Sequence, residues 1–266
     1  MKPIPAFPSY RDRYLPAMTA ARIASLPDKE WAPVIITTGA IEQHGPHLPV
    51  AVDAMMGQVW LSLALPRLPA GASCYVAPAI TIGKSNEHTG FPGTLLISKA
   101  VLRELLLASA RQIHGWGFRK FAVINTHGGN ISVIMYTLRE IQATYGIRTE
   151  FLRGNRDLGL SQQEATYGFH AGELETSWML AAAGGLVRME HAACEYPARL
   201  DDPGSLRPEA APATYSWASQ DVSKTGIMGD ATAATVEKGT RWIEWCAGKY
   251  AEQIAELCRD GRGATV

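Results

Sequence analysis

The chain of 266 residues balances 25 Lys and Arg against 25 Asp and Glu, and 47% of its residues are hydrophobic. This length suits one large α/β domain with a well-buried core, and the composition is that of a compact globular protein rather than a disordered one. A formal net charge of zero argues against a general nucleic-acid or anionic-membrane binder, which would carry a basic surplus.

The sequence predicts neither a membrane span nor export. The longest uncharged stretch near the middle, 121–138, is interrupted by Asn, His and Gly, whereas a spanning helix needs about 20 predominantly apolar residues. The N-terminal residues lack the apolar core of a signal peptide, and the four cysteines form no CxxC pair. We therefore expect a cytoplasmic protein with reduced thiols and no membrane or nucleic-acid partner.

Strands and helices are predicted to alternate along the chain. Residues 1–30 are rich in proline and predict an N-terminal arm that leads to a short helix around Thr19–Leu26. Short apolar runs rich in β-branched residues predict buried strands at 33–39, 74–79, 119–125 and 148–153. Apolar residues at helical spacing predict helices that follow Asp53 as an N-cap and that cover 98–114, 131–141, 173–183 and 234–257.

This alternation predicts an α/β fold with a mostly parallel, doubly wound sheet. No internal repeat or linker divides the chain, so we expect a single domain over residues 1–266. The proline-rich stretch 194–222 is predicted to be an irregular excursion. Excursions of this length usually serve as lids, binding loops or oligomer contacts.

Polar segments follow the predicted strands, and in an open parallel sheet such segments converge beyond the carboxyl ends. In extended backbone Glu42 and His44 face the same way, and Asp53 can return a carboxylate to their pocket. The alternative is an exposed polar loop in which Asp53 only caps a helix. His127 is followed by two glycines that leave open space beside it, which favours a ligand over a core histidine.

A third polar segment contains His170 and Glu173, which would lie about one helical turn apart and face one site. Glu175 would then point elsewhere, as a first-turn carboxylate favoured by the helix dipole, unless it orients another ligand.

Five side chains are thus expected to converge: Glu42, His44, Asp53, His127 and Glu173. Three carboxylates and two imidazoles suit Zn²⁺ or Mn²⁺, and they are too many for one catalytic zinc. They would serve two metals if one carboxylate bridges. The sequence has neither a GxGxxG motif after the first strand nor a GxxxxGK[ST] motif, so nucleotide binding is unsupported.

The same segments resemble those of the creatininase (creatinine amidohydrolase) family. The resemblance runs from about residue 30 to 255 and is carried, in order, by 39–49 with Asp53, 91–94, 125–130, 170–177 and 226–239. It implies a three-layer α/β/α fold, a dinuclear metal centre and hydrolysis of amide-type bonds, often in a homohexamer.

The resemblance also assigns roles to single residues. One metal would sit on Glu42, Asp53 and His127, and the other on His44, Asp53 and Glu173, with Asp53 bridging. His170 falls where the family keeps a catalytic acid/base histidine. We expect two divalent cations per subunit, zinc first, with manganese or iron as alternatives.

Two departures favour a branch of the family other than creatininase proper. Creatininase carries Tyr-Glu where this chain has Gly128-Gly129, and it takes a metal ligand from that glutamate. It also has a glutamate just before its catalytic histidine, where this chain has Phe169.

The expected activity is hydrolysis of a C–N bond in a small cyclic amide by a metal-activated water, with His170 passing a proton to the leaving nitrogen. His88 is either a substrate contact or a surface-loop histidine. Other branches of the family offer alternatives: hydrolysis of a formamide, of a keto-inositol ring, or of a precursor peptide. A non-catalytic metal-binding assembly protein is the alternative from another class.

Overall fold

The computed structural model describes residues 8–154, 158–196 and 217–259. Its centre is a four-stranded, all-parallel sheet with the order β2-β1-β3-β4. The strands are β1 (Pro33–Thr38), β2 (Tyr75–Val76), β3 (Lys120–Asn125) and β4 (Arg148–Leu152). The expected parallel sheet is therefore confirmed, although the strand predicted at 74–79 is only two residues long.

Strands β1 and β3 form the middle of the sheet and end at the same level. They pair from Pro33 opposite Lys120 to Thr38 opposite Asn125. Every residue of β1 is buried, as expected for a parallel strand covered on both faces. The chain moves from β1 to one side for β2 and to the other side for β3, which creates a topological switch point beyond Thr38 and Asn125.

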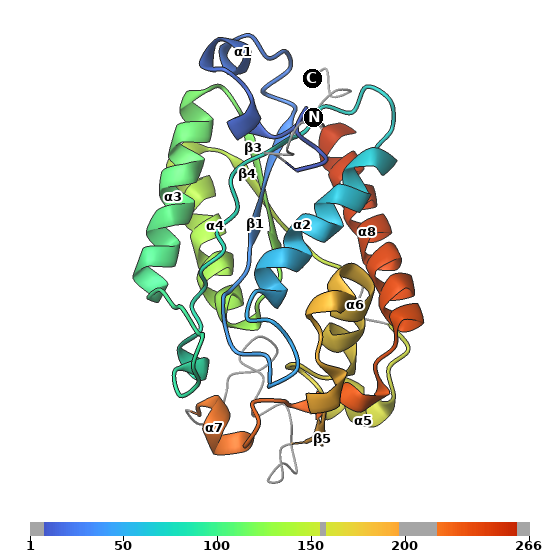
Figure 1. Ribbon diagram of the computed structural model, residues 1–266. Coiled ribbons are helices and arrows are strands. Elements are labelled where there is room, and N and C mark those ends of the chain that lie inside the picture. The colour runs from blue at the N-terminus through green and yellow to red at the C-terminus, as the bar shows by residue number, and fades with distance from the viewer. Residues whose placement is uncertain (1–7, 155–157, 197–216, 260–266) are drawn as a thin grey trace, which may run out of the picture.

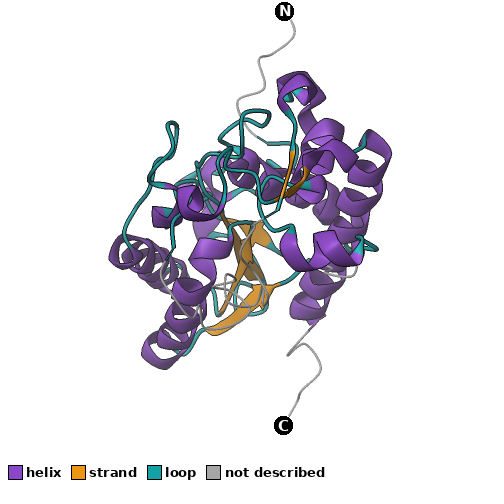
Figure 2. Cartoon of the chain, turned by 90° about the horizontal axis from the view of Figure 1, so that it is seen from below, coloured by secondary structure: helices purple, strands orange, loops and turns teal. Residues whose placement is uncertain are grey.

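Helices cover both faces of the sheet and give the three-layer α/β/α arrangement (Figures 1 and 2). One layer consists of α3 (Lys99–Gly115) and α4 (Ile131–Tyr145). The other consists of α2 (Val52–Ala64), α6 (Glu173–Ala183) and α8 (Val236–Arg259), with α8 packed on both α2 and α6.

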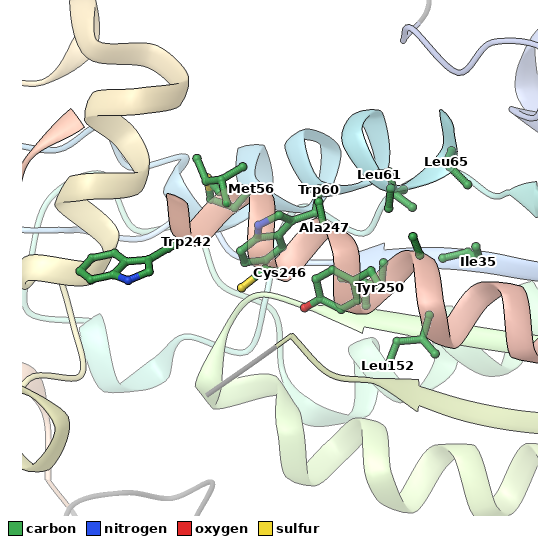
Figure 3. Close-up of a cluster of buried hydrophobic side chains, with 14 of the residues drawn as sticks. Ile35, Met56, Trp60, Leu61, Leu65, Leu152, Trp242, Cys246, Ala247 and Tyr250 are labelled. Carbon is green, nitrogen blue, oxygen red and sulfur yellow. The ribbon is translucent and has the colours of Figure 1, made fainter. Parts of the chain in front are cut away.

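Side-chain alternation along β1 divides the core in two. Val34 and Ile36 belong to the cluster under α3 and α4, whereas Ile35 belongs to the cluster under α2, α6 and α8. In that second cluster Trp60 packs against Tyr250, with ring centroids 5.5 Å apart (Figure 3).

Shorter elements surround the carboxyl end of the sheet and the N-terminal arm. The helices are α1 (Ala20–Ala24), α5 (Gln162–Tyr167) and α7 (Ser219–Val222), and the antiparallel pair is β5 (Cys194–Glu195) with β6 (Gly229–Asp230). Single 3-10 turns lie at Leu15–Ala17, Leu65–Arg67, Asn86–His88, Gly128–Asn130, Gly184–Leu186, Met189–His191 and Ala231–Ala233.

One sequence prediction is wrong, and another falls largely outside the described residues. The N-cap of α2 is Ala51, so the prediction of Asp53 as the cap is wrong: Asp53 lies inside the first turn. Most of the 194–222 excursion, residues 197–216, lies outside the described residues. Within the described ranges, no helix combines the length and apolar character needed to cross a membrane.

Candidate metal centre

The switch point between β1 and β3 is where the polar segments meet. Thr38 Oγ1 donates to Asn125 Oδ1 (2.9 Å), which ties the ends of the two strands together. Thr126, just beyond β3, donates its hydroxyl to the backbone oxygen of Asp53 (2.8 Å) and so fixes the first turn of α2 over the strand ends. The loops carrying Glu42 and His127 are therefore held beside Asp53.

A first group of possible ligands consists of Glu42, Asp53 and His127, all buried. His127 Nδ1 lies 3.2 Å from Glu42 Oε2 and 3.4 Å from Asp53 Oδ2. One ligand atom from each residue falls within 4.8 Å of the other two. The sequence prediction placed these three residues on one metal, and the structure brings them together.

A second group forms around His44 on the other side of Asp53. His44 Nε2 lies 3.7 Å from Asp53 Oδ1 and 3.7 Å from Glu175 Oε2. Asp53 thus presents one oxygen to His127 and the other to His44, the arrangement that a bridging carboxylate needs.

Unpartnered buried atoms mark the same place. Glu42 Oε2, Asp53 Oδ2 and His44 Nε2 are inaccessible to solvent and make no hydrogen bond among the described residues. Buried polar atoms are normally satisfied, so each orphan needs an explanation. His44 Nδ1 donates to the Glu42 backbone oxygen (3.0 Å), so in the neutral ring the lone pair is on Nε2. Carboxylate and imidazole lone pairs that face one another fit bound divalent cations.

The carboxylates of the cluster also favour positive charge beside them, as the pKa values of the neighbouring groups show. Burial alone would lower the pKa of His44, but Asp53 and Glu175 outweigh it and raise this pKa to about 10. Burial would raise the pKa of Asp53, but His127 and His44 lower it to about 2. Carboxylates that hold protons on neighbouring imidazoles would hold metal cations in the same way.

Glu173 is not in this cluster, contrary to the sequence prediction. Its carboxylate forms an ion pair with Lys238 Nζ (2.6 Å) on α8. Glu175 takes its place beside His44 and also accepts a hydrogen bond from the Ala171 backbone (2.6 Å). Burial, opposed by His44, raises the pKa of Glu175 to about 7.

The backbone conformation at the start of α6 explains why Glu175, and not Glu173, lies beside His44. His170 is not helical but pairs with Met228 in an antiparallel bridge, and Ala171 adopts a left-handed conformation (φ 52°). The helix begins only at Glu173, so the spacing of one turn between His170 and Glu173 does not apply. The carboxylate two residues further along faces His44 instead.

His170 lies within the cluster as a neutral imidazole. Burial, reinforced by His88 and His44, holds its pKa well below the usual value. Its Nε2 donates to the Gln43 backbone oxygen (2.8 Å), so the lone pair is on Nδ1, 3.8 Å from Glu42 Oε1. This histidine can therefore accept a proton on the side that faces the carboxylates.

His88 is buried, so the surface-loop alternative is wrong. Its ring packs against that of His170, with centroids 4.3 Å apart. Gln43 Nε2 donates to His88 Nδ1 (2.9 Å), which leaves the proton on Nε2, 3.4 Å from Glu42 Oε1.

A cavity of about 440 Å³ opens beside the cluster. Its lining includes the polar residues His127, His170 and Glu175 of the site. Larger aromatic and aliphatic residues also line it: Trp60, Phe151, Leu160 and Trp178. Its volume falls within the range of small-molecule sites in proteins.

Sequence reasoning missed three residues of the site. Gln43 joins His88 and His170 through its side chain and backbone, and Glu87 lies against His127. For Glu175 the sequence predicts a first-turn carboxylate favoured by the helix dipole, unless it orients another ligand. Gln43 and Glu87 each adjoin a singled-out residue, yet adjacency alone does not show that a side chain turns toward the site.

Comparisons with known proteins identify the family of this chain. The family model described as creatinine amidohydrolase (Creatininase) matches residues 16–254. A mycofactocin precursor peptide peptidase of Mycolicibacterium smegmatis is 32% identical over 86% of this chain and 87% of its own length. A creatinine amidohydrolase of Pseudomonas putida is 27% identical over 84% of this chain and 88% of its own length.

Solved structures share the fold. One described as "Creatininase Mn" is 23% identical and covers 93% of this chain and 99% of its own, with a TM-score of 0.68. Another, a mutant creatininase of "Zn-Zn type", is 22% identical and covers 92% and 98%, with a TM-score of 0.70. Both descriptions name a metal, manganese in the first and zinc in the second.

Proposed function

Because the chain belongs to the creatininase family and is therefore a hydrolase of carbon–nitrogen bonds, we propose that it is an amidohydrolase with two divalent cations. One cation would bind Glu42, Asp53 and His127. The other would bind His44, Asp53 and Glu175, with Asp53 shared. Zinc is the first expectation, with manganese or iron as alternatives.

The observation that carries this proposal is the pair of overlapping ligand groups around Asp53. Its two oxygens face different histidines, Oδ2 toward His127 Nδ1 (3.4 Å) and Oδ1 toward His44 Nε2 (3.7 Å). Three of the atoms that would bind metal are buried without any other partner among the described residues. A single cation would leave one histidine and one carboxylate uncompensated.

Bound cations would lower the pKa of a shared water and polarise the substrate carbonyl. The residues of the chain would do the rest. His170 accepts a proton at Nδ1 and passes it to the leaving nitrogen, because its neutral form holds the lone pair on that atom. While His170 carries this proton, Glu42 Oε1, which lies 3.8 Å from His170 Nδ1, stabilises the protonated ring. Phe169 and Trp217 stack edge-to-face and line a small pocket together with Glu42, Asp53 and His127.

For the substrate, a small cyclic amide is the first candidate, bound with its scissile carbonyl toward Asp53 and His170. His88, with its Nε2 proton directed at Glu42, would contact the substrate or support His170. A formamide or a keto-inositol ring would fit the same machinery.

A peptide is the second candidate, and two observations favour it. The cavity of about 440 Å³ is larger than a small cyclic amide needs, and aromatic and aliphatic side chains are among its lining residues. The relative that is 32% identical is named as a peptidase of a precursor peptide. The aromatic and aliphatic lining would then accept a side chain next to the scissile bond.

A substrate screen tests both candidates. Protein stripped of metal and reloaded with Zn²⁺ or Mn²⁺ is assayed with cyclic amides, lactams, formamides and short peptides with aromatic side chains. We expect turnover of one class that disappears with chelator and returns with metal. Metal binding without turnover of any class would support the non-catalytic assembly protein instead.

Self-association stays a prediction, with a homohexamer expected from the family. Four exposed apolar side chains in the loop before α3 and on its first turns support it: Leu95, Leu96, Val101 and Leu105, each 41–56% exposed. Large contiguous apolar patches on a surface mark interaction sites. Light scattering after size-exclusion chromatography measures the subunit number, and Leu105→Glu should lower it.

A further inference from the structure

The two ring nitrogens of His127 lie in different surroundings. Nδ1 faces the carboxylates of Glu42 and Asp53. Nε2 points the other way, toward the backbone oxygen of Lys84 (3.1 Å) and Glu87 Oε1 (3.4 Å). A proton on Nε2 can be donated to these oxygens, and the lone pair then remains on Nδ1.

Glu87 is a carboxylate held in a fixed place. Its side chain is only 13% exposed, and Lys84 Nζ lies 3.3 Å from Oε2. In the structure it lies on the side of His127 away from the ligand cluster, and it is absent from each of the possible ligand groups.

Gly129 makes room for this carboxylate. A Cβ atom at residue 129 would lie 2.2 Å from Glu87 Oε1, 2.4 Å from His127 Nε2 and 2.5 Å from the Lys84 oxygen. No side chain fits in that space while Glu87 keeps its position. The position of the Glu87 carboxylate therefore requires glycine at residue 129, although the two residues are far apart in the sequence.

We propose that Glu87 is a positioning residue for the metal centre: with the Lys84 carbonyl it holds the proton on His127 Nε2 and turns Nδ1 toward the cation on Glu42 and Asp53. This inference rests on the proposed metal centre. A carboxylate behind a ligating histidine fixes its tautomer and ring orientation and increases the basicity of the other nitrogen. Removing such a partner typically weakens metal binding by about 10–100-fold.

The test measures Zn²⁺ affinity by competition with a chromophoric chelator. Glu87→Ala should weaken one of the two sites by about 10–100-fold. Gly129→Ala should weaken it at least as much, because an added Cβ would displace the carboxylate and also press on His127 Nε2. Glu87→Gln keeps an acceptor oxygen and should lose less. Glu190→Ala, which removes an exposed glutamate that belongs to none of the possible ligand groups, is the matched control and should bind as wild type does.

Two further measurements separate positioning from a general structural role. The melting temperature of metal-free Glu87→Ala and Glu87→Gln should match that of the metal-free wild type, whereas Gly129→Ala should melt lower because its added Cβ would meet the Lys84 backbone oxygen. In the zinc-loaded wild type, long-range ¹H–¹⁵N spectra should show the His127 proton on Nε2, and in Glu87→Ala this signal should broaden or split.

The outcomes distinguish this inference from the proposed function. Two ions bound in the wild type and unchanged affinities in Glu87→Ala would overturn only the role of Glu87. A wild-type protein that binds no metal would overturn both.

Discussion

The carboxylate of Glu175 faces the imidazole of His44, with Oε2 3.7 Å from Nε2, in a buried cluster of acidic and imidazole groups. Glu173, two residues earlier on the same helix, turns to Lys238 instead. The choice between these two glutamates decides which carboxylate completes the second cation site.

Substitution of each glutamate by glutamine gives opposite results. Glu175→Gln should remove one ion per chain and lower kcat/KM by about 100-fold or more, since losing a ligand costs at least as much as losing its supporting partner. Glu173→Gln should keep both ions and lose about 1 kcal/mol of stability through its ion pair with Lys238, in which the lysine is 36% and the glutamate 9% exposed.

Metal content by mass spectrometry and urea denaturation check this pair. One ion lost from Glu173→Gln, with two kept in Glu175→Gln, would contradict the placement of Glu175 in the site.

Metal loading should release protons. Without metal, Asp53 and Glu175 keep the pKa of His44 at about 10, and Glu42 and Asp53 raise that of His127, so both rings are protonated at pH 7. Ligating histidines are neutral and ligating carboxylates are ionised, so at least two protons should leave at pH 7: one from each ring and a fraction from Glu175, whose pKa is about 7. Calorimetry in buffers of different ionisation enthalpy counts them, and His44→Gln should release one fewer.

The same pKa shift gives a stability prediction for the metal-free protein. His44 has a raised pKa in the folded state, so its contribution is fully present below about pH 6.5, the usual histidine value. It is lost as the pH rises toward 10. The melting temperature of chelator-treated protein should fall over this interval, and a constant value would contradict the charge balance of the cluster.

His170 should matter for catalysis but not for metal content. His170→Ala removes the lone pair on Nδ1 and should lower kcat by about 10²–10⁴-fold while two ions remain bound. His191→Ala, at an exposed position, is the control. Because His170 also lies within reach of His44 and Glu175, loss of an ion in the variant would identify it as a ligand rather than a proton carrier.

The fold could be predicted largely from the sequence because its signals are local. The buried strands at Pro33–Thr38 and Lys120–Asn125 are runs of β-branched and apolar residues, and the helix from Lys99 begins after Ser98, whose side chain accepts from Val101 N. Loops at the ends of parallel strands must converge, so the meeting of Glu42, Asp53 and His127 followed from the topology.

The rest of the site depends on features that spacing does not encode. The left-handed Ala171 shifts the phase of α6 and exchanges Glu173 for Glu175. The helix α2 begins before Asp53 rather than at it, since Ala51 is the N-cap. The burial of His88 and the contact of Glu87 with His127 depend on the loop that carries both residues. This loop is distant in sequence from β1 and β3, and it folds over the site.

The close packing of α6 on α8 should make any side chain at Gly239 destabilising. A Cβ at Gly239 would lie 1.8 Å from the backbone oxygen of Ser177, on the helix that carries Glu175. Backbone cannot yield as a flexible side chain can, so Gly239→Ala should cost about 1–3 kcal/mol or more. Because α6 must shift, the variant should also bind the second cation more weakly.

Gly115→Ala provides the matched control. Gly115 is also helical, at the end of α3, but an added Cβ there would meet nothing within 4 Å. It should be neutral or stabilising by up to about 1 kcal/mol, since alanine restricts the unfolded chain. Urea midpoints compared at equal m-values measure both changes. Equal stability of the two variants would show that α6 and α8 are not packed as closely as the 1.8 Å approach requires.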